Sequence, residues 1–390
     1  MDMAGIGGGA SGRQNIARAC AARGLTVNVF GIGDSTNAPD PKAADGLGAE
    51  AGEIYYRNFA LPSEPFLWRL QSWRHAPRLA RALRGVPPPR RLFVAGSPFW
   101  MLAARWAWPG CTLAYLYECL LTTCLPHTWD PAAPRGWWSR LDFAGLRRTE
   151  RVALTRASRC FVATAAGRDE ILALAPAARV EMVSYGCRFF ERSDEQRRQQ
   201  RAAVGVGADA CVVGLVGYND RNKAFDHAIR VLPQTDARVV LVICGDGPHR
   251  AACEAAARDA GVTARVHFAG WQRDMASWYA AFDVVASLSS YDAYPNVIRE
   301  GLAVGLPVVV PHHDPPHVFA GVAAAVQESG GGLLFDRTAS ATGSSATLAA
   351  CLSRLAADPA LRAALGARGQ AYAEQHFHWD GLVERLLTLA

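Results

Sequence analysis

Short runs of β-branched residues alternate with longer stretches rich in alanine, leucine and arginine along nearly the whole chain. Strands that alternate with helices in this way build parallel sheets that helices cover on both faces. The first half of the chain has five predicted strands, at 25–30, 91–95, 112–117, 159–163 and 179–184. The second half has six, at 211–216, 238–244, 265–268, 283–287, 307–310 and 332–335. The alternation predicts an α/β fold with two doubly wound, Rossmann-like domains.

The predicted helices lie between these strands, at 11–22, 66–83, 140–155, 247–260, 295–304 and 345–357. The segment 189–207 is the most polar in the chain and predicts a surface linker that runs into a helix. We therefore expect an N-terminal domain over 1–191 and a C-terminal domain over 204–375. The remaining segment, 376–390, contains a closing helix that is apolar on one side.

A glycine-rich segment at 5–12 precedes the first predicted helix. Gly8 and Gly9 would let backbone N–H groups approach a phosphate or sugar oxygen at the helix N-terminus. A tight turn that needs positive φ angles is the alternative interpretation. A doubly wound domain usually opens with a central strand before such a turn, and none precedes this one. We expect translation to start upstream of Met1 and to add a strand of roughly five to eight residues; a domain that lacks its central strand, with two unpaired edges, is the alternative.

The composition excludes several classes of protein. Half of the residues are hydrophobic and 19% are charged, which excludes a mainly disordered chain. No run of eighteen apolar residues is free of charge, so no membrane-spanning helix is predicted. The ten cysteines are scattered and form no Cys-x-x-Cys pair. Their spacing argues against a disulfide scaffold or structural zinc and indicates a reducing, cytoplasmic setting.

The net charge of +6 is divided unevenly along the chain. Residues 1–200 hold 26 Lys and Arg against 17 Asp and Glu, whereas residues 201–390 hold 15 against 18. A basic half suggests an anionic partner, although arginine-rich codon usage is the alternative explanation. The segments 68–84 and 137–151 combine arginine with tryptophan, as membrane-interface surfaces do, and no nucleic-acid-binding module accompanies them. We predict an anionic membrane surface as partner, and no nucleic acid.

The sequence feature that points most clearly to a binding site is a pair of acidic residues, Asp292 and Glu300. Asp292 would lie in the loop after a parallel strand, where such sheets bind ligands, and Glu300 would lie on the following helix. The N–H groups at that helix N-terminus would face an anion between the two carboxylates. Carboxylates accept hydrogen bonds from sugar hydroxyls, whereas the helix end suits a diphosphate. The predicted donor contacts here are Asp292, Ala293, Tyr294, Pro295, Asn296, Val297 and Glu300.

This stretch, which continues into Gly-Leu-Pro-Val-Val at 305–309, resembles the E-x7-E signature of retaining glycosyltransferases of family 4. The resemblance implies the GT-B fold, in which two Rossmann-like domains face each other across a cleft and the final helix crosses back to the first domain. It implies transfer of a sugar from a UDP- or GDP-sugar with retention, without a metal or other cofactor. Asp292 would hold the transferred sugar and Glu300 the ribose. Asp292 stands where the family usually has Glu.

The turn after the strand at 211–216 corresponds to the diphosphate site of this family. The family has an Arg and a Lys five positions apart; Lys223 fits the Lys position, and Tyr218 occupies the Arg position. We expect Arg221 to substitute, with Asn219 as a further donor contact, because cations offset the charge on a leaving diphosphate. A solvated turn is the alternative.

The strand at 265–268 runs into a loop that, by the same resemblance, touches the nucleotide base. Backbone atoms of Gly270, Trp271 and Gln272 would read the edge of the base, and the Trp271 ring would pack near it. Packing of Trp271 in the core is the alternative.

In the first half, Tyr117 occupies the position where the family often has a His near the transferred sugar, and Glu118 follows it. Tyrosine can bind a sugar hydroxyl but cannot shuttle a proton near neutral pH as histidine can. We take Tyr117 and Glu118, together with Lys223 and Asp292, as the candidate catalytic residues. Polar residues at the sheet edge without a ligand are the alternative.

The cluster of His312, His313, Asp314 and His317 predicts no metal site, because adjacent histidines point in different directions. We predict a hexosyltransferase that acts on a saccharide or lipid-linked acceptor in cell-surface polysaccharide or glycolipid biosynthesis. It would be cytoplasmic, at the inner face of the membrane. A nucleotide-sugar 2-epimerase of the same fold and an inactive homologue that binds a nucleotide sugar are the alternatives.

Overall fold

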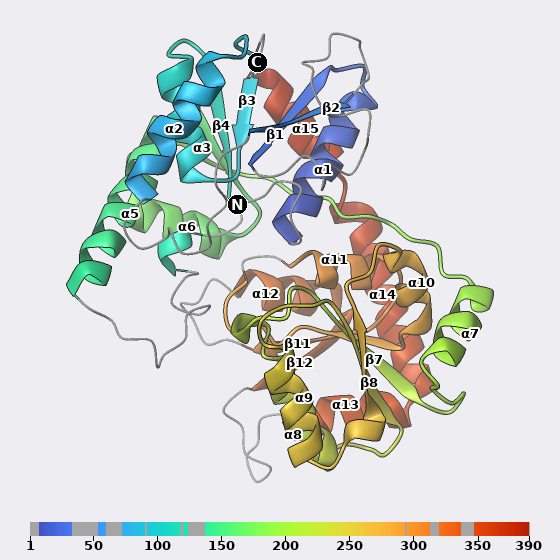
Figure 1. Ribbon diagram of the computed structural model, residues 1–390. Coiled ribbons are helices and arrows are strands. Elements are labelled where there is room, and N and C mark those ends of the chain that lie inside the picture. The colour runs from blue at the N-terminus through green and yellow to red at the C-terminus, as the bar shows by residue number, and fades with distance from the viewer. Residues whose placement is uncertain are drawn as a thin grey trace. The chain divides into compact units, whose positions relative to one another are not determined.

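The computed structural model describes residues 8–32, 54–59, 72–89, 92–117, 120–123, 137–292, 295–312, 320–336 and 347–389. The chain forms two compact units (Figure 1). The N-terminal unit comprises Met1–Gly186 and Trp379–Ala390, and the C-terminal unit comprises Cys187–His378. The first crossing from one unit to the other thus comes five residues before the expected domain end at 191, and the closing segment groups with the N-terminal unit.

The C-terminal unit is built on one sheet of six parallel strands in the order β12-β11-β10-β7-β8-β9. All six were predicted, with bounds that differ by no more than two residues. The strands are β7 (Cys211–Val216), β8 (Val239–Cys244), β9 (Val266–Gly270), β10 (Val284–Ala286), β11 (Val308–His312) and β12 (Gly332–Asp336). Central strands such as β7 are buried on both faces, which explains their nearly continuous apolar sequence.

Helices cover both faces of this sheet (Figure 1). One core cluster joins β7 and β8 to α8 (Phe225–Val231), α9 (Arg250–Asp259) and α13 (Leu348–Ala357). The opposite cluster packs on α10 (Met275–Ala281), α11 (Asn296–Ala303), α12 (Ala320–Ser329) and α14 (Pro359–His376). Short 3-10 turns lie at Arg221–Lys223, Leu232–Gln234 and Thr263–Arg265. Asp or Thr side chains cap the N-termini of α10, α13 and α14 and satisfy N–H groups that have no partner within the helix.

The described strands of the N-terminal unit form two separate parallel sheets. One pairs β1 (Val27–Ile32) with β2 (Ile54–Phe59). The other has the order β3-β4-β5-β6, with β3 (Leu92–Ala95), β4 (Thr112–Leu116), β5 (Arg159–Val162) and β6 (Val180–Met182). The sequence did not predict β2, because its six residues, Ile-Tyr-Tyr-Arg-Asn-Phe, include strand-forming residues but do not alternate regularly between apolar and polar.

The helices of the N-terminal unit are α1 (Gly8–Ala21), α2 (Ser72–Arg84), α3 (Pro98–Ala107), α5 (Trp137–Arg156), α6 (Ala165–Leu174) and α15 (Asp380–Thr388). The last of these, drawn in red beside α1 in Figure 1, comes from the end of the chain. Leu382 and Leu386 of α15 are buried against Leu116 of β4 and Phe161 of β5. The apolar side that the sequence shows on this helix is therefore the side that completes the core of the N-terminal unit.

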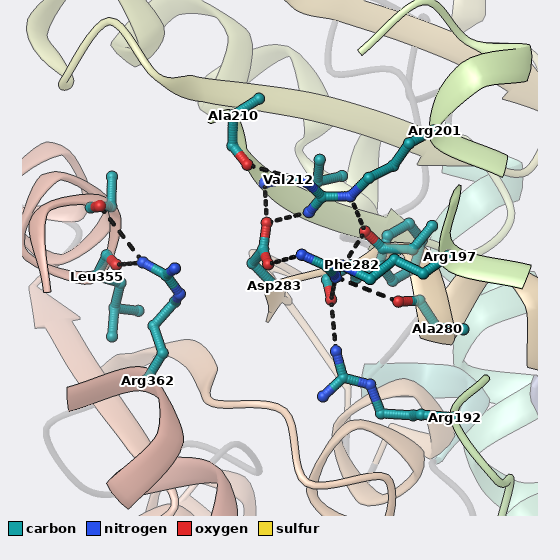
Figure 2. Close-up of polar contacts among 12 residues, drawn as sticks. Arg192, Arg197, Arg201, Ala210, Val212, Ala280, Phe282, Asp283, Leu355 and Arg362 are labelled. Atoms are coloured by element: carbon teal, nitrogen blue, oxygen red, sulfur yellow. Dashed lines mark hydrogen bonds and ion pairs between the residues drawn. The ribbon is translucent and has the colours of Figure 1, made fainter. Parts of the chain in front are cut away.

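The polar segment predicted as a surface linker is partly buried. Its helix α7 (Asp194–Ala203) places Arg197 and Arg201 on either side of Asp283, which precedes β10 (Figure 2). Arg197 lies 2.6 Å from Asp283 Oδ1, and Asp283 Oδ2 accepts a 2.7 Å bond from the Val212 N–H. The same arginines, with Arg192, donate to the last carbonyl groups of α10 and its C-cap. The sequence predicts a surface linker here, whereas these arginine side chains cap a helix C-terminus.

The eight cysteines that the structure describes are all free, and most are buried. Burial raises the pKa of the Cys160 and Cys187 thiols to about 12, so these thiols are inert packing groups. Within the described part of the chain, none of the helices is long and apolar enough to cross a membrane.

Replacement of Asp283 by alanine should destabilise the C-terminal unit by about 3–5 kcal/mol, because it leaves the buried Arg201 and the partly buried Arg197 without their counter-charge. Urea unfolding followed by circular dichroism measures this loss. Asp259→Ala, at the exposed end of α9, is the matched control and should change stability by less than about 0.5 kcal/mol. A decrease in the free energy of unfolding below about 1 kcal/mol for Asp283→Ala would show that the ion pairs of Asp283 with Arg197 and Arg201 contribute little to stability.

Candidate functional site

Four loops of the C-terminal unit follow the carboxyl ends of neighbouring parallel strands. In sheet order they follow β10, β7, β8 and β9, and they contain the segments 287–292, 217–223, 245–249 and 270–272. In a parallel sheet these ends share one edge, and ligands bind at that edge. These segments contain seven of the predicted donor contacts, which therefore lie along one edge of the sheet: Asn219, Arg221, Lys223, Gly270, Trp271, Gln272 and Asp292.

Lys223 and Asp292 meet at this edge. The Lys223 Nζ lies 2.8 Å from Asp292 Oδ2, and the same amino group donates a 3.4 Å bond to Ser289 Oγ. Both charged side chains are about one-fifth exposed, so a ligand can reach them. The turn that presents Lys223 is capped by Asp220, whose carboxylate accepts the Lys223 N–H at 3.1 Å. The structure thus brings together a cation and a carboxylate that the sequence places 69 residues apart.

Asn222 joins the two loops that carry this pair. Its side-chain Nδ2 donates to the Tyr291 carbonyl, and its Oδ1 accepts the Tyr291 N–H, both at 2.7 Å. Its own carbonyl accepts the Ser290 N–H, also at 2.7 Å. The amide therefore pairs with backbone as a neighbouring strand would. No motif in the sequence distinguishes Asn222, although it is adjacent to Lys223.

The loops after β7, β8 and β9 touch one another through their glycines. Gly245 has a φ of +148°, and a Cβ atom at this position would lie 1.8 Å from the Gly217 carbonyl oxygen. Its N–H donates to the Gly270 carbonyl at 2.7 Å. Only glycine permits this approach, which draws the three loops together.

Glu300 is 6% exposed and lies inside α11. Its Oε2 accepts a 2.8 Å bond from the Tyr279 hydroxyl, and its Oε1 lies 3.3 Å from Arg188 Nε. Burial raises the pKa of this carboxyl, and Arg188 and Tyr279 oppose the rise. A carboxylate can accept about four hydrogen bonds, so these two partners orient Glu300 and leave it capacity for a ligand. Neither partner could be predicted from the sequence, because Tyr279 belongs to α10 and Arg188 to the segment between β6 and α7.

The other predicted donor contacts differ in accessibility. Trp271 is 50% exposed with the Arg273 guanidinium 5.4 Å from its ring, so it is not part of the core. Gln272 donates to the Ala269 carbonyl at 2.6 Å beside Gly270, the last residue of β9. Arg221 and Tyr218 are exposed on the turn that carries Lys223.

Asn219 differs from the expectation of a donor contact. Its side chain is fully buried and its Oδ1 accepts from the Cys253 thiol of α9 at 3.5 Å. Its backbone bonds to Asp246 and His249 link the loops after β7 and β8. Asn219 therefore stabilises the loops that carry the site through its backbone hydrogen bonds.

The residues before α11 are only partly described. Pro295 is the N-cap residue of α11, which begins at Asn296, and Val297 is buried. The Asn296 side chain contacts Arg299 on the same helix. Ala293 and Tyr294 lie outside the described residues.

In the N-terminal unit, Tyr117 follows β4 and is 2% exposed. Its hydroxyl donates to Glu170 on α6, so the group expected to contact a sugar is engaged within the fold. Glu118 lies outside the described residues. Gly8 and Gly9 form the start of α1, three residues before the predicted helix start.

The described residues contain no group of three or more His, Cys, Asp or Glu side chains that could hold a metal ion. His312 is exposed at the end of β11, and His313, Asp314 and His317 lie outside the described part of the chain.

Comparisons with known proteins match both units. Residues 7–186 match the family model described as Glycosyl transferase 4-like domain, and residues 210–358 match the model described as Glycosyl transferases group 1. The lipopolysaccharide core biosynthesis glycosyltransferase LpsE of Rhizobium meliloti (strain 1021) is 32% identical over 189 residues, 48% of this chain and 52% of that protein. The matched segment spans about half the length of this curated relative and of the next.

Two solved structures cover nearly the whole chain. Sucrose-phosphate synthase from Thermosynechococcus elongatus matches with a TM-score of 0.75 and 20% identity over 100% of this chain and 95% of that chain. Anabaena HepE, solved in complex with UDP-glucose, matches with a TM-score of 0.66 and 17% identity over 93% of this chain and 98% of that chain. At these identities the likeness shows the fold, two Rossmann-like α/β domains.

The buried Glu300 predicts a pH effect on stability. A carboxyl group whose pKa is raised in the folded state stabilises the fold fully below its unfolded pKa, and this contribution is lost as the pH rises through the folded pKa. Wild-type protein should therefore lose stability relative to Glu300→Gln when the pH rises from about 4 to about 8. Urea midpoints of both proteins across this range measure the difference. A constant difference, or one that moves in favour of the wild type, would contradict the raised pKa.

Proposed function

Since the chain belongs to a glycosyltransferase family with the GT-B fold, we propose that it transfers a hexose from a nucleotide-diphosphate sugar to an acceptor, with retention at the anomeric carbon. The observation that carries this proposal is the Lys223–Asp292 pair at the carboxyl edge of the C-terminal sheet. A lysine at hydrogen-bond distance from a carboxylate suits a ligand that carries a phosphate next to a sugar.

The order of the loops supports a nucleotide-diphosphate sugar. Asp292 follows β10, Lys223 follows β7, and the exposed Trp271 follows β9, with β8 between β7 and β9. From β10 to β9 there are three strand spacings of about 4.8 Å, or about 14 Å in all. An extended donor with its sugar at Asp292, its diphosphate at Lys223 and its base at Trp271 follows the same order.

The chemistry proposed for each residue follows from its charge. Lys223 offsets the negative charge that grows on the leaving diphosphate, with Arg221 from the same turn in support. Asp292 holds the transferred sugar while positive charge develops at its anomeric carbon. Glu300, oriented by Tyr279 and Arg188, binds the ribose. The leaving phosphate takes the proton of the acceptor, so no metal or other cofactor is required.

The relatives suggest substrates to test first. HepE was solved with UDP-glucose, and LpsE is a lipopolysaccharide core biosynthesis glycosyltransferase. We therefore propose a UDP-sugar, with a GDP-sugar second, as donor and a saccharide or lipid-linked saccharide as acceptor, in cell-surface polysaccharide or glycolipid biosynthesis. The cytoplasmic face of the membrane is the proposed location.

The N-terminal unit has a basic surface that could contact the membrane at the proposed location. From Pro65 to Tyr117 the sequence contains eight arginines, five tryptophans and no acidic residue. Arg78, Arg81 and Arg84 of α2 and Arg105 of α3 are exposed, and Trp106 beside Arg105 is 40% exposed. Arginine with exposed tryptophan is a surface that anionic lipid headgroups attract.

Nucleotide release distinguishes the proposed reaction from its alternatives. The protein is incubated with UDP- and GDP-sugars, with and without a saccharide extract as acceptor, and the products are followed by mass spectrometry. Nucleotide release that depends on acceptor, with retained configuration, supports a retaining transferase. An epimerised sugar would indicate a 2-epimerase, and binding without turnover would indicate an inactive homologue.

Two carboxylate variants should separate the roles of Asp292 and Glu300. Asp292→Asn should lower kcat and kcat/KM about ten- to a hundredfold, because its interaction strengthens in the transition state. Glu300→Gln should mainly raise the donor KM by a similar factor, because the ribose does not change during the reaction. Steady-state kinetics measures both, with Asp259→Asn at the end of α9 as control. Full kcat in Asp292→Asn would contradict its catalytic placement.

The basic surface predicts binding to anionic vesicles. Full-length protein should float with phosphatidylglycerol vesicles at low salt and not with phosphatidylcholine vesicles, and added salt should release it. Arg81→Glu with Arg84→Glu should weaken this binding more than about tenfold. Arg258→Glu with Arg354→Glu makes the same charge change on the C-terminal unit and should have little effect. Equal recovery with both lipids, or equal loss in both double variants, would contradict the proposal.

A further inference from the structure

The Phe190 ring packs against both side chains that bind Glu300. The Arg188 Cζ lies 4.8 Å from the centroid of the Phe190 ring, and the Phe190 and Tyr279 rings are stacked, with centroids 5.4 Å apart and planes 23° apart. A guanidinium over an aromatic face and two stacked rings at this distance both attract. Arg188 and Tyr279 in turn contact one oxygen each of Glu300, at 3.3 and 2.8 Å. The four side chains therefore form one closed group, the Glu300 cluster.

The first residues of the C-terminal unit supply half of this cluster. Because the unit begins at position 187, Arg188 and Phe190 are its second and fourth residues. Side chains of an extended chain point alternately to opposite sides, and these two face the cluster. Phe189 between them is 43% exposed and stacks instead on His378, with centroids 5.5 Å apart. Two adjacent phenylalanines therefore have different tasks, and only Phe190 touches the groups that hold Glu300.

Each oxygen of the Glu300 carboxylate keeps an acceptor site for a ligand. An ionised carboxylate has about four acceptor sites, two on each oxygen. The Tyr279 hydroxyl uses one on Oε2, and the Arg188 Nε uses one on Oε1. Two donors from two directions fix the orientation of the carboxylate and leave one site on each oxygen. This pattern matches a ligand that presents two neighbouring hydroxyl groups.

The protonation state of Glu300 is the variable one in this cluster. Burial raises the pKa of its carboxyl, and Arg188, Tyr279 and the neighbouring Arg299 oppose the rise. Burial and the Glu300 charge also raise the pKa of the Tyr279 phenol, and burial raises that of the adjacent Cys187 thiol to about 12. Both groups therefore stay protonated near neutral pH, and the two arginines stay charged. The charge of Glu300 thus depends on its cations, of which Arg188 forms an ion pair with it.

We propose that Arg188 and Phe190 are positioning residues of the nucleotide site: Phe190 aligns Arg188 with Tyr279, and Arg188 keeps Glu300 an ionised, oriented acceptor for the hydroxyl groups of a ribose. The choice of a ribose rests on the proposed function. A protonated carboxyl would lose the charge-assisted bonds and would occupy one acceptor site with its own hydrogen. The segment that follows the boundary between the units therefore sets the pH range in which the nucleotide binds.

Nucleotide affinity across pH tests this assignment. Titration calorimetry of the full chain with UDP and with GDP runs from about pH 6 to about pH 9, and each variant is compared with wild type at the same pH. Arg188→Met should weaken binding more than about tenfold at the acid end and less than about threefold at the alkaline end, because Glu300 regains its charge as the pH rises. Arg188→Lys keeps the positive charge and should restore most of the affinity at the acid end. Phe190→Leu removes the flat ring and should weaken binding about threefold, with the same trend.

Carbon-13 NMR of the glutamate carboxyl groups tests the cluster without a nucleotide. Glu300→Gln removes one signal and so identifies the Glu300 carboxyl. The pKa of this carboxyl should be higher in Arg188→Met than in wild type, and close to wild type in Arg188→Lys. An unchanged pKa in Arg188→Met overturns the proposal. So does a loss of nucleotide affinity that is the same at every pH, because a merely structural role of Arg188 would produce it.

Phe189→Leu is the matched control, because Phe189 is adjacent to Phe190 and stacks on His378. It should leave both nucleotide affinity and the Glu300 pKa unchanged, and the thermal midpoint of each variant shows that it is folded. Equal effects of Phe189→Leu and Phe190→Leu would overturn the role of Phe190. A Glu300 carboxyl that responds to Arg188 in a protein that binds neither UDP nor GDP contradicts the proposed function instead.

Discussion

The amide of Asn222 is the contact on which the geometry of the C-terminal site depends. It pairs with both backbone groups of Tyr291 and so joins the loop after β7 to the loop after β10. These bonds are buried, and leaving one buried group unsatisfied costs about 1–3 kcal/mol. The Lys223–Asp292 pair lies between the same two loops. A loop that carried Lys223 alone would be a solvated turn, whereas the joined loops present a cation and a carboxylate at one fixed distance.

The linker between the units is part of the C-terminal unit. Arg188 binds Glu300, and Arg192, Arg197 and Arg201 bind the end of α10 and Asp283 (Figure 2). The sequence shows these arginines as a polar run, and composition assigns such a run to solvent. In the tertiary structure these arginines instead donate hydrogen bonds to the carbonyl groups at the end of α10 and form ion pairs with the buried carboxylates of Asp283 and Glu300. The same segment therefore stabilises the unit and orients a residue of the candidate site.

The periodicity of the sequence predicted all six strands of the C-terminal sheet, since each is an apolar run bounded by polar turns. It missed β2, whose aromatic and polar residues carry no clear period. In the N-terminal unit it identified Tyr117 as the residue at the end of β4. It could not identify Glu170 as the partner of the Tyr117 hydroxyl, because one glutamate on a helix has no signature until its partner is known.

The sequence by itself determined the order of the six strands of the C-terminal sheet, the two-unit organisation and the positions of Lys223, Asp292 and Glu300. These follow from local periodicity and from a motif within one strand–loop–helix segment. Only the tertiary structure decided which of them meet. Asn222 and Tyr291 are 69 residues apart, and Arg188 and Glu300 are 112 residues apart. The first pair forms because β7 and β10 are distant in sequence but lie side by side and end at one edge of the sheet, and the second because the segment before α7 packs against α11. The order of strands in the sheet is not written in any local pattern.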